Sequence, residues 1–157
     1  ALSERTDEEI IDKFCKHFQY EAVMFTANQS VQGKRLPIYH TNVMMCVADG
    51  FVVVCLDSID DINERQELIE KFEESEKEII EISEDQINHF AGNMLQVKND
   101  KENILVMSTA AYKSLEQDQI NQIENYCSII HSSLDTIEEI GGGSARCMMA
   151  EVFLPKK

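Results

Sequence analysis

Basic residues are scarce in this sequence. Its 14 lysines and arginines stand against 29 aspartates and glutamates, which gives a net charge of −15. Such a surface repels the phosphates of nucleic acids and of anionic membranes, so we expect neither as a partner. The same charge would attract a small cationic ligand, or would simply keep the protein in solution.

Long apolar runs are also missing. No stretch of eighteen apolar residues is present, so no membrane span is expected, and the first residues, ALSERTDEE, lack the basic start and apolar core of a signal peptide. With 157 residues, 43% of them hydrophobic, the chain is long enough for one ordinary domain with a real core. We therefore expect a single domain over residues 1–157.

Paired cysteines and the common cofactor motifs are absent. The five cysteines are widely spaced and form no C-x-x-C pair, which argues against a zinc site and favours small core residues in a reducing, cytoplasmic setting. No phosphate-binding Walker loop, dinucleotide fingerprint, G-x-S-x-G or H-E-x-x-H motif occurs. One cysteine, Cys147, has an unusual neighbourhood.

What the sequence does contain is a repeat with a period near fifty residues. Each copy has a Ser/Thr/Asp cluster, an amphipathic helix and a short apolar strand; the copies cover residues 1–27, 55–83 and 106–134. The first helix has an apolar stripe that includes Ile10, Phe14 and Phe18. Capping boxes are expected at Thr6 with Glu9 and at Ser114 with Gln117. The strands that follow the helices are expected at residues 21–25, 78–82 and 128–132.

Hairpins are expected between the repeats. One turns at Asp49-Gly50, a second turns at residues 99–101, and residues 145–154 read as a further opening strand without a partner. In this register Asn42, Asn93 and Arg146 occupy equivalent positions. If the repeats pack around a pseudo-axis, the segments near these positions converge on it. An α+β sandwich of unrelated hairpins is the alternative.

The stretch GGGSARCMM, residues 141–149, places three of the six glycines just before Cys147. Glycines remove side-chain bulk, so the backbone N–H groups of Gly142, Gly143 and Ser144 are expected to approach a bound substrate closely. A thiol in such a loop is a candidate nucleophile. A flexible loop before a core cysteine is the alternative.

A thiol nucleophile needs a proton shuttle, which is commonly a histidine. His40 is the best of the four candidates, because it begins a hairpin strand and its neighbours can orient an imidazole; these neighbours are Tyr39, Thr41 and Asn42. The other three, His17, His89 and His131, are expected to be structural.

The motifs IYHTNVMM, FAGNML and GGGSARCMMAEVF together resemble those of the arginine deiminase-related amidinotransferase/hydrolase family. This is the pentein, or guanidine-modifying, superfamily, and the likeness is to its citrulline-hydrolase branch. The resemblance implies an α/β fold: a five-bladed α/β propeller of ββαβ modules, of which this chain holds between two and three. It also implies that residues 1–157 are the C-terminal half of a longer protein, since family members are roughly twice this length.

The resemblance implies that Cys147 attacks the central carbon of a guanidinium or ureido group of a citrulline- or arginine-class substrate. His40 would act as acid and then as base in hydrolysis of the covalent intermediate, and neither a metal nor an organic cofactor is implied. Asn42, Gly142, Gly143 and Ser144 would bind the substrate. Family deiminases carry an aspartate at the place of Asn42, and an amide there suits a neutral ureido group better than a cation.

Two further expectations follow from the missing half. Acidic residues that hold the substrate would lie outside this chain, so the chain alone is expected to be inactive, and its unpaired strands should be covered by the N-terminal half or by another copy. An amidinotransferase with the same intermediate, or a non-catalytic module of the same fold, are the competing functions.

Overall fold

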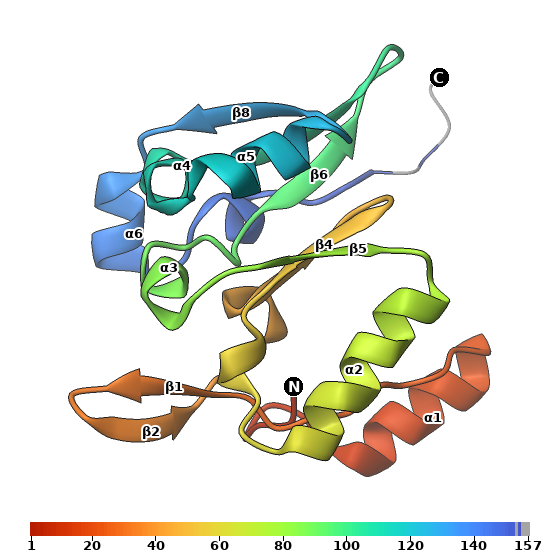
Figure 1. Cartoon of the computed structure of the whole chain (residues 1–157). Coiled ribbons are helices and arrows are strands. Elements are labelled where there is room, and N and C mark those ends of the chain that lie inside the picture. Colours follow the sequence, from red (N-terminus) through yellow and green to blue (C-terminus); the bar gives the residue numbers. More distant parts are fainter. Residues whose placement is uncertain (153, 155–157) are drawn as a thin grey trace.

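A computed structural model describes residues 1–152 and 154. The chain is a mixed α/β structure with three small sheets (Figure 1): a two-stranded sheet in the order β1-β2 and two three-stranded sheets in the orders β3-β4-β5 and β6-β7-β8. The strands are β1 (Asn28–Val31), β2 (Lys34–Pro37), β3 (Met45–Val47), β4 (Phe51–Val54), β5 (Glu78–Glu81), β6 (Leu95–Lys98), β7 (Asn103–Ser108) and β8 (Ser128–Ser132).

The helices are α1 (Glu8–Phe18), α2 (Ile62–Glu74), α3 (Glu84–Asn88), α4 (Thr109–Ser114), α5 (Gln117–Glu124) and α6 (Asp135–Gly141). Three 3₁₀ turns, η1 (Thr41–Val43), η2 (Leu56–Ser58) and η3 (Ala145–Met148), join them. None of the helices in the described residues is long and apolar enough to cross a membrane.

Each three-stranded sheet is built by one ββαβ unit. In the first, β3 and β4 pair antiparallel around the predicted Asp49-Gly50 turn, where Gly50 has a φ of 88°, and α2 then leads to β5, which runs parallel to β4. Asp61 caps α2 by accepting from the backbone N–H groups of Asn63 and Glu64. The predicted hairpin and the predicted strand over residues 78–82 are thus confirmed, the latter one residue shorter.

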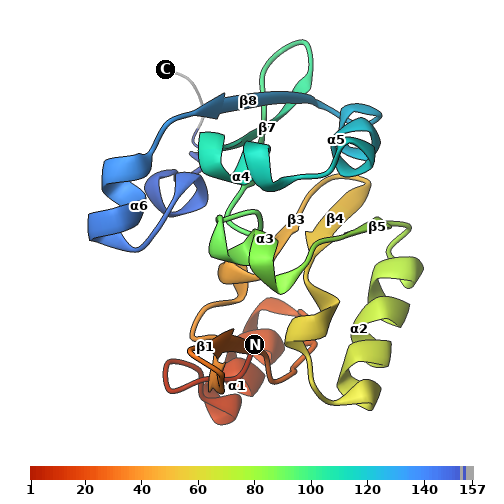
Figure 2. The same cartoon turned by 60° about the vertical axis from the view of Figure 1, so that its left-hand side comes forward.

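The second unit repeats this order of strands and has two helices in the place of α2 (Figure 2). Its strands β6 and β7 pair antiparallel around the predicted turn at residues 99–101, α4 and α5 follow, and β8 runs parallel to β7. Strands β3 and β6 begin 50 residues apart, and so do β5 and β8. The predicted repeat is therefore present in two complete copies, which favours it over a sandwich of unrelated hairpins.

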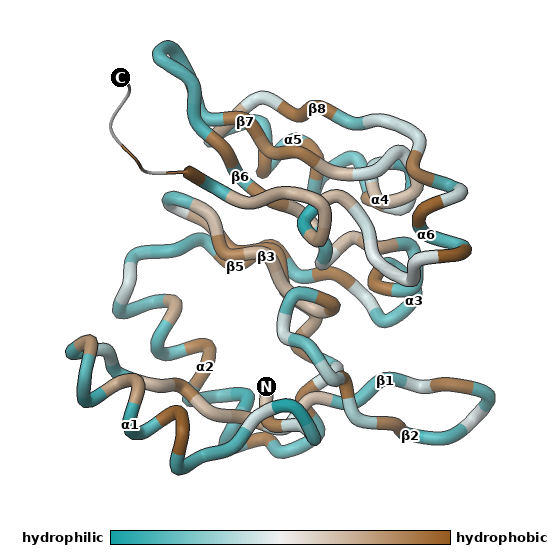
Figure 3. Tube along the Cα trace, turned by 180° about the vertical axis from the view of Figure 1, so that it is seen from behind, coloured by the Kyte–Doolittle hydropathy of each residue, from teal (hydrophilic) through white to brown (hydrophobic). Residues whose placement is uncertain are grey.

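The central strands form the core. All four residues of β4 have 0% exposure, because the hairpin partner and β5 flank the strand and side chains cover both faces. Leu105 and Met107 of β7 and Ile123 of α5 are buried to the same extent. In Figure 3 these central strands contain hydrophobic stretches, whereas the tip of the β6–β7 hairpin is hydrophilic.

The two units meet through close backbone packing. A Cβ atom added at Gly92, which precedes β6, would lie 2.3 Å from the carbonyl oxygen of Val43 in η1. The two segments therefore touch backbone to backbone, and a glycine is required at this point. The two units also meet where the hydroxyl of Tyr126, after α5, donates to Glu78 of β5 at 2.7 Å.

The N-terminal repeat is incomplete. Helix α1 forms as expected, but Asp7, and not Thr6, caps it, and residues 21–25 form no strand; an isolated parallel bridge joins Leu2 to Thr26. A strand needs a partner, and the described chain offers this segment only that bridge. The second expected capping box is also displaced: Ser114 ends α4, and Glu116 with Gln119 caps α5.

The predicted strand over residues 145–154 is wrong within the described residues. Residues 145–148 form η3, and residues 149–152 have no regular structure; residue 153 lies outside the described part of the chain. The hydrogen bond from the N–H of Cys147 to the carbonyl of Ser144, 3.0 Å long, closes the 3₁₀ turn. This turn, and not a strand, presents the cysteine.

Candidate active site

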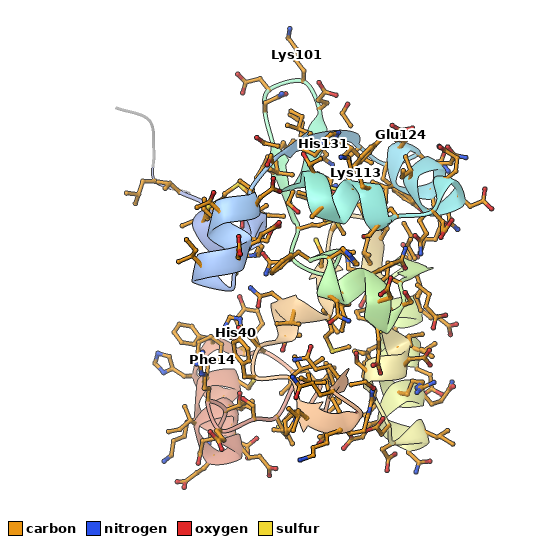
Figure 4. All side chains as sticks on the ribbon, turned by 90° about the vertical axis from the view of Figure 1, so that its left-hand side faces the viewer. Phe14, His40, Lys101, Lys113, Glu124 and His131 are labelled. Carbon is orange, nitrogen blue, oxygen red and sulfur yellow. The ribbon has the colours of Figure 1, made fainter. Side chains whose placement is uncertain are left out.

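A cavity of about 490 Å³ lies between the 3₁₀ turn η1, the end of α3 and the glycine loop after α6. Figure 4 places His40 on the side of the molecule that carries α6, the light blue helix. Residues that lie more than a hundred positions apart in the sequence thus face one space. Its lining consists of Arg5, Gln29, Tyr39, His40, Asn42, Val43, Ile87, Asn88, Phe90, Asn93, Gly141, Gly142, Gly143 and Cys147.

The glycine loop positions Cys147. Helix α6 ends at Gly141 and is capped by Gly142, whose φ of 67° lies in the left-handed region that favours glycine. At Gly143 a Cβ atom would lie 3.2 Å from the sulfur of Cys147, so only a glycine leaves the thiol uncrowded. Both predicted glycines therefore serve the loop, and both line the cavity.

Ser144 lies behind this lining. It is 0% exposed, its hydroxyl donates to the carboxylate of Glu138 at 2.6 Å, and its carbonyl accepts from Cys147. The side chain expected to bind substrate thus holds the loop to α6 and is not among the residues that line the cavity. Its contribution to the site is the shape of the turn.

His40 is exposed in the cavity, where it precedes η1. Its position is fixed by the buried residue two positions earlier, Ile38, whose N–H donates to the carbonyl of Ala27 at 2.8 Å. The Nδ1 atom of His40 lies in close hydrogen-bond contact with the side-chain oxygen of Asn42. When that oxygen accepts, Nδ1 carries the hydrogen and Nε2 is left to accept or donate a proton.

Two asparagine side chains reach the sulfur of Cys147. The Nδ2 atom of Asn93 lies 3.2 Å from Sγ, and the Nδ2 atom of Asn42 lies 3.9 Å from it. The same Nδ2 of Asn93 also donates to the backbone carbonyl of Asn42 at 3.2 Å. Asn42 therefore stands between the imidazole of His40 and the thiol, and it contacts both.

The remaining histidines lie elsewhere, as expected. His89 contacts the carbonyl of Asp85 in α3, His131 contacts Thr109 and stacks on Tyr112, and His17 lies edge-on against Phe18 in α1. None of the three lines the cavity.

The cysteines also divide as expected. All five are free thiols, and Cys147 alone is exposed. Burial raises the pKa of Cys46 to about 12, and it also raises the pKa of Cys55 and of Cys127. These three thiols are therefore core residues of low reactivity.

The sequence reasoning missed Arg5 and Asn93, whereas it named Tyr39 as a neighbour that can orient His40. The guanidinium of Arg5 lies 4.6 Å from the ring centroid of Tyr39, and no carboxylate of the described residues forms an ion pair with it. It also lines an adjoining cavity of about 420 Å³ together with Arg146. The signal that could have found Asn93 was its position in the repeat, where it is the equivalent of Asn42.

The described lining holds no acidic side chain, and its polar groups are amides, one imidazole, one phenol and one guanidinium. Within the described residues, no group of three or more histidines, cysteines, aspartates or glutamates is arranged to hold a metal ion. The site offers a thiol, an imidazole with a free nitrogen and several amide groups. That set of groups can attack, protonate and orient a small polar substrate.

The repeated ββαβ units, with a thiol and an imidazole at the cavity where they meet, are the arrangement of a pentein-type fold. The family model described as eukaryotic N,N dimethylarginine dimethylhydrolase matches residues 1–154. The chain therefore belongs to the N,N-dimethylarginine dimethylhydrolase family, which confirms the predicted superfamily. No curated protein sequence matches the chain.

Solved structures share the fold. The N-terminal domain of ArgZ bound to product, an arginine dihydrolase from the ornithine-ammonia cycle in cyanobacteria, is 15% identical with a TM-score of 0.62. An asparagine-to-serine variant of that domain, covalently bound to a reaction intermediate, gives a TM-score of 0.64 at the same identity. The ternary complex of AgrE with ornithine and NAD⁺ is 20% identical with a TM-score of 0.54.

The match covers most of this chain but only part of these proteins. It spans 90% of the chain and 46% of the ArgZ domain, and 76% of the chain and 16% of AgrE. The chain thus spans about half the length of the ArgZ domain that it matches.

Proposed function

We propose that this chain supplies the thiol and the imidazole of a cysteine-dependent hydrolase that cleaves a C–N bond of a linear guanidino or ureido amino acid. The observation that carries the proposal is that Cys147 and His40 line one cavity and are connected through Asn42. Membership of the N,N-dimethylarginine dimethylhydrolase family supports the class of reaction.

The first half of the reaction forms a covalent intermediate. The sulfur of Cys147, as thiolate, attacks the central carbon of the guanidino or ureido group and forms a tetrahedral adduct. The C–N bond to the leaving amine or ammonia then breaks, and Nε2 of His40 donates the proton that this nitrogen needs. The substrate carbon remains bonded to sulfur as a thiouronium or thiocarbamate.

The second half releases the product. His40, now unprotonated, takes a proton from a water molecule, which attacks the carbon bonded to sulfur. The C–S bond breaks and returns the thiolate of Cys147. No step of this sequence requires a metal or an organic cofactor.

The lining supports a substrate with an amino-acid carboxylate at one end. Arg5 is free of carboxylate partners among the described residues and lies at the cavity, so it is suited to that carboxylate. Among the described residues, the lining offers amide groups and no carboxylate to the guanidino or ureido end of the substrate. Within the citrulline and arginine class, this set of groups favours the neutral ureido group of citrulline.

We also propose that the two ββαβ units belong to a five-bladed propeller completed by further residues of a longer protein. The length of the ArgZ domain supports this, as does the exposed apolar stripe of α1, where Phe14 is 52% exposed. Another copy of the chain is the alternative cover for that stripe.

The test incubates the complete protein with citrulline, arginine, dimethylarginine and agmatine, and measures ammonia or amine and the amino-acid products. Cys147→Ala and His40→Ala are the test variants, and Cys15→Ala, on α1, is the matched control for loss of a thiol. We expect turnover of at least one substrate, a loss of about a thousandfold or more in both test variants, and no change in the control.

Turnover by Cys147→Ala equal to that of the wild type would contradict the proposal. Addition of an amine acceptor separates the competing transferase, because a transferase forms a new guanidino compound whereas a hydrolase does not. Absence of turnover with every substrate would favour a non-catalytic module.

A further inference from the structure

We propose that Asn93 is a further catalytic residue, whose side-chain N–H stabilises the thiolate of Cys147. This inference rests on the proposed function, because it concerns the same thiol, but its test needs no turnover. Asn93 was not among the residues that the sequence motifs marked for chemistry.

The geometry places Asn93 against the reacting atom. Its Nδ2 lies 3.2 Å from the sulfur of Cys147, which is nearer than the 3.9 Å of Asn42. Its backbone carbonyl accepts the N–H of Arg146, the residue before the cysteine, at 3.3 Å. Asn93 therefore holds the segment of Cys147 through its main chain and the sulfur through its side chain.

The repeat explains why two asparagines meet at one sulfur. Asn42 and Asn93 lie 51 positions apart, one before each β-hairpin, and the side chain of Asn93 donates to the backbone of Asn42. Equivalent positions of the two ββαβ units thus touch each other. The loop after α6 brings Cys147 to the point where they touch.

Asn93 is rigidly held. It is 4% exposed, and the preceding Gly92 packs against the backbone of Val43 so closely that no Cβ atom fits. A donor that is fixed before the reaction needs no reorganisation when charge develops on the sulfur. Because the amide is neutral, it stabilises a thiolate without adding a charge that would repel a cationic substrate.

The other end of the amide points to a functional role. The side-chain oxygen of Asn93 is buried and has no hydrogen-bond partner among the described residues. An unpaired buried acceptor is costly, so side-chain packing alone does not account for an asparagine here. The Nδ2 group, which contacts the sulfur and a backbone carbonyl, accounts for it.

The experiment measures the rate at which iodoacetamide alkylates Cys147 in the complete protein between pH 6 and pH 10. The modified peptide is followed by mass spectrometry, and Cys147→Ser identifies it. The test variant is Asn93→Asp, which keeps the shape of the side chain but replaces the donor with an acceptor; Asn93→Ala is the second. Asn125→Asp makes the same chemical change at the end of α5, outside the cavity lining.

We expect alkylation near pH 7 to slow about tenfold or more in both Asn93 variants, which is the scale of a hydrogen bond to a charged group. Near pH 10 the rates should converge with the wild type, because the thiolate then forms without help. Asn125→Asp should leave the profile unchanged. Circular dichroism checks that each variant is folded.

Two results would overturn the proposal. The first is a rate near pH 7 that stays within twofold of the wild type in folded Asn93→Asp. The second is an equal slowing at every pH, which indicates lost access to the thiol and not lost stabilisation of the thiolate. Failure of the wild-type protein to hydrolyse any substrate would reject the proposed function and leave the alkylation result intact.

Discussion

A Cβ atom placed on Gly143 would lie 3.1 Å from the Cβ and 3.2 Å from the sulfur of Cys147. The two residues are four positions apart, and η3 folds the second back over the first. The backbone at Gly143 thus forms the wall against which the thiol rests. This contact explains why residue 143 is a glycine.

Gly143→Ala should therefore move the thiol. A methyl group at this distance makes the thiol shift by a few tenths of an ångström. Since a misplacement of about 1 Å at a reacting atom costs about a hundredfold in rate, we expect kcat/KM of the complete protein to fall by about tenfold, with little change in thermal stability. Gly141→Ala is the control, because its added Cβ meets only Ile137, at an ordinary 3.9 Å. Equal activity of the two variants would contradict this role.

Much of the fold could be predicted from local signals. The Asp49-Gly50 pair fixes one hairpin and the fifty-residue spacing predicts the second, because turn residues and apolar alternation act over a few positions. His40 and Cys147 could be chosen for their neighbours alone, and the structure places both at one cavity.

The features that could not be predicted depend on contacts between segments far apart in the sequence. Residues 22–25 are a short apolar run like that of a buried strand, but pairing decides strand formation, and here Thr26 alone bridges to Leu2. A strand is also expected over residues 145–154, yet residues 149–152 have no regular structure and Val152 is 76% exposed. Asn93 was missed because its chemistry arises from a contact across 54 positions.

Gly92→Ala should destabilise the junction of the two units. Its Cβ would lie 2.3 Å from the carbonyl oxygen of Val43 and 2.8 Å from the carbonyl carbon of Met44, which are backbone atoms that cannot rotate away. We expect a loss of about 3 kcal/mol in the free energy of unfolding, at the upper end for overpacking. Urea unfolding measures it. A loss below about 1 kcal/mol would mean that the units separate easily at this point.

The same contact adjoins the thiol, since Asn93 follows Gly92 directly. Gly92→Ala should consequently slow the alkylation of Cys147 as well as lower stability. Gly33→Ala is a useful comparison, because nothing lies within 4 Å of its added Cβ, and its φ of 76° gives only local strain in the turn between β1 and β2. It should cost about 1 kcal/mol.

Arg35 of β2 should make stability depend on pH in acid. Its guanidinium binds Asp60 and Glu84 and donates to the carbonyl of Asp57 at 3.1 Å, so it ties the β1–β2 hairpin to the first unit. Hydrogen bonds from Arg35 and Asn28 lower the pKa of Asp60. For Glu84, burial acts to raise the pKa, but the hydrogen bonds from Arg35 and Ser30 together outweigh it and lower the pKa.

A carboxyl group whose pKa is lowered by folding stabilises the folded state at pH values above its ordinary pKa. The ordinary pKa is 3.8 for aspartate and 4.5 for glutamate. This stabilisation is lost as the pH falls through the lowered pKa of the folded protein. Arg35→Met should lower stability by roughly 1 kcal/mol at pH 7, and its stability should fall less steeply than that of the wild type below about pH 4.5. Thermal unfolding at several pH values measures this. Lys13→Met, which removes an exposed pair with Glu9, should match the wild type throughout.

The apolar stripe of α1 should be covered in the complete protein. Ile10, Phe14 and Phe18 are 60%, 52% and 55% exposed, and none of the residues of α1 is buried within the described structure. If other residues of the protein cover this stripe, Phe14→Glu places a charge in an apolar contact and should cost about 3 kcal/mol in the free energy of unfolding. If a second copy covers it, the variant should instead shift the dimer to monomers in sedimentation equilibrium. Ile62→Glu, at the 78% exposed start of α2, is the control and should change neither quantity by more than about 0.5 kcal/mol. Equal behaviour of the two variants would show that the stripe faces solvent.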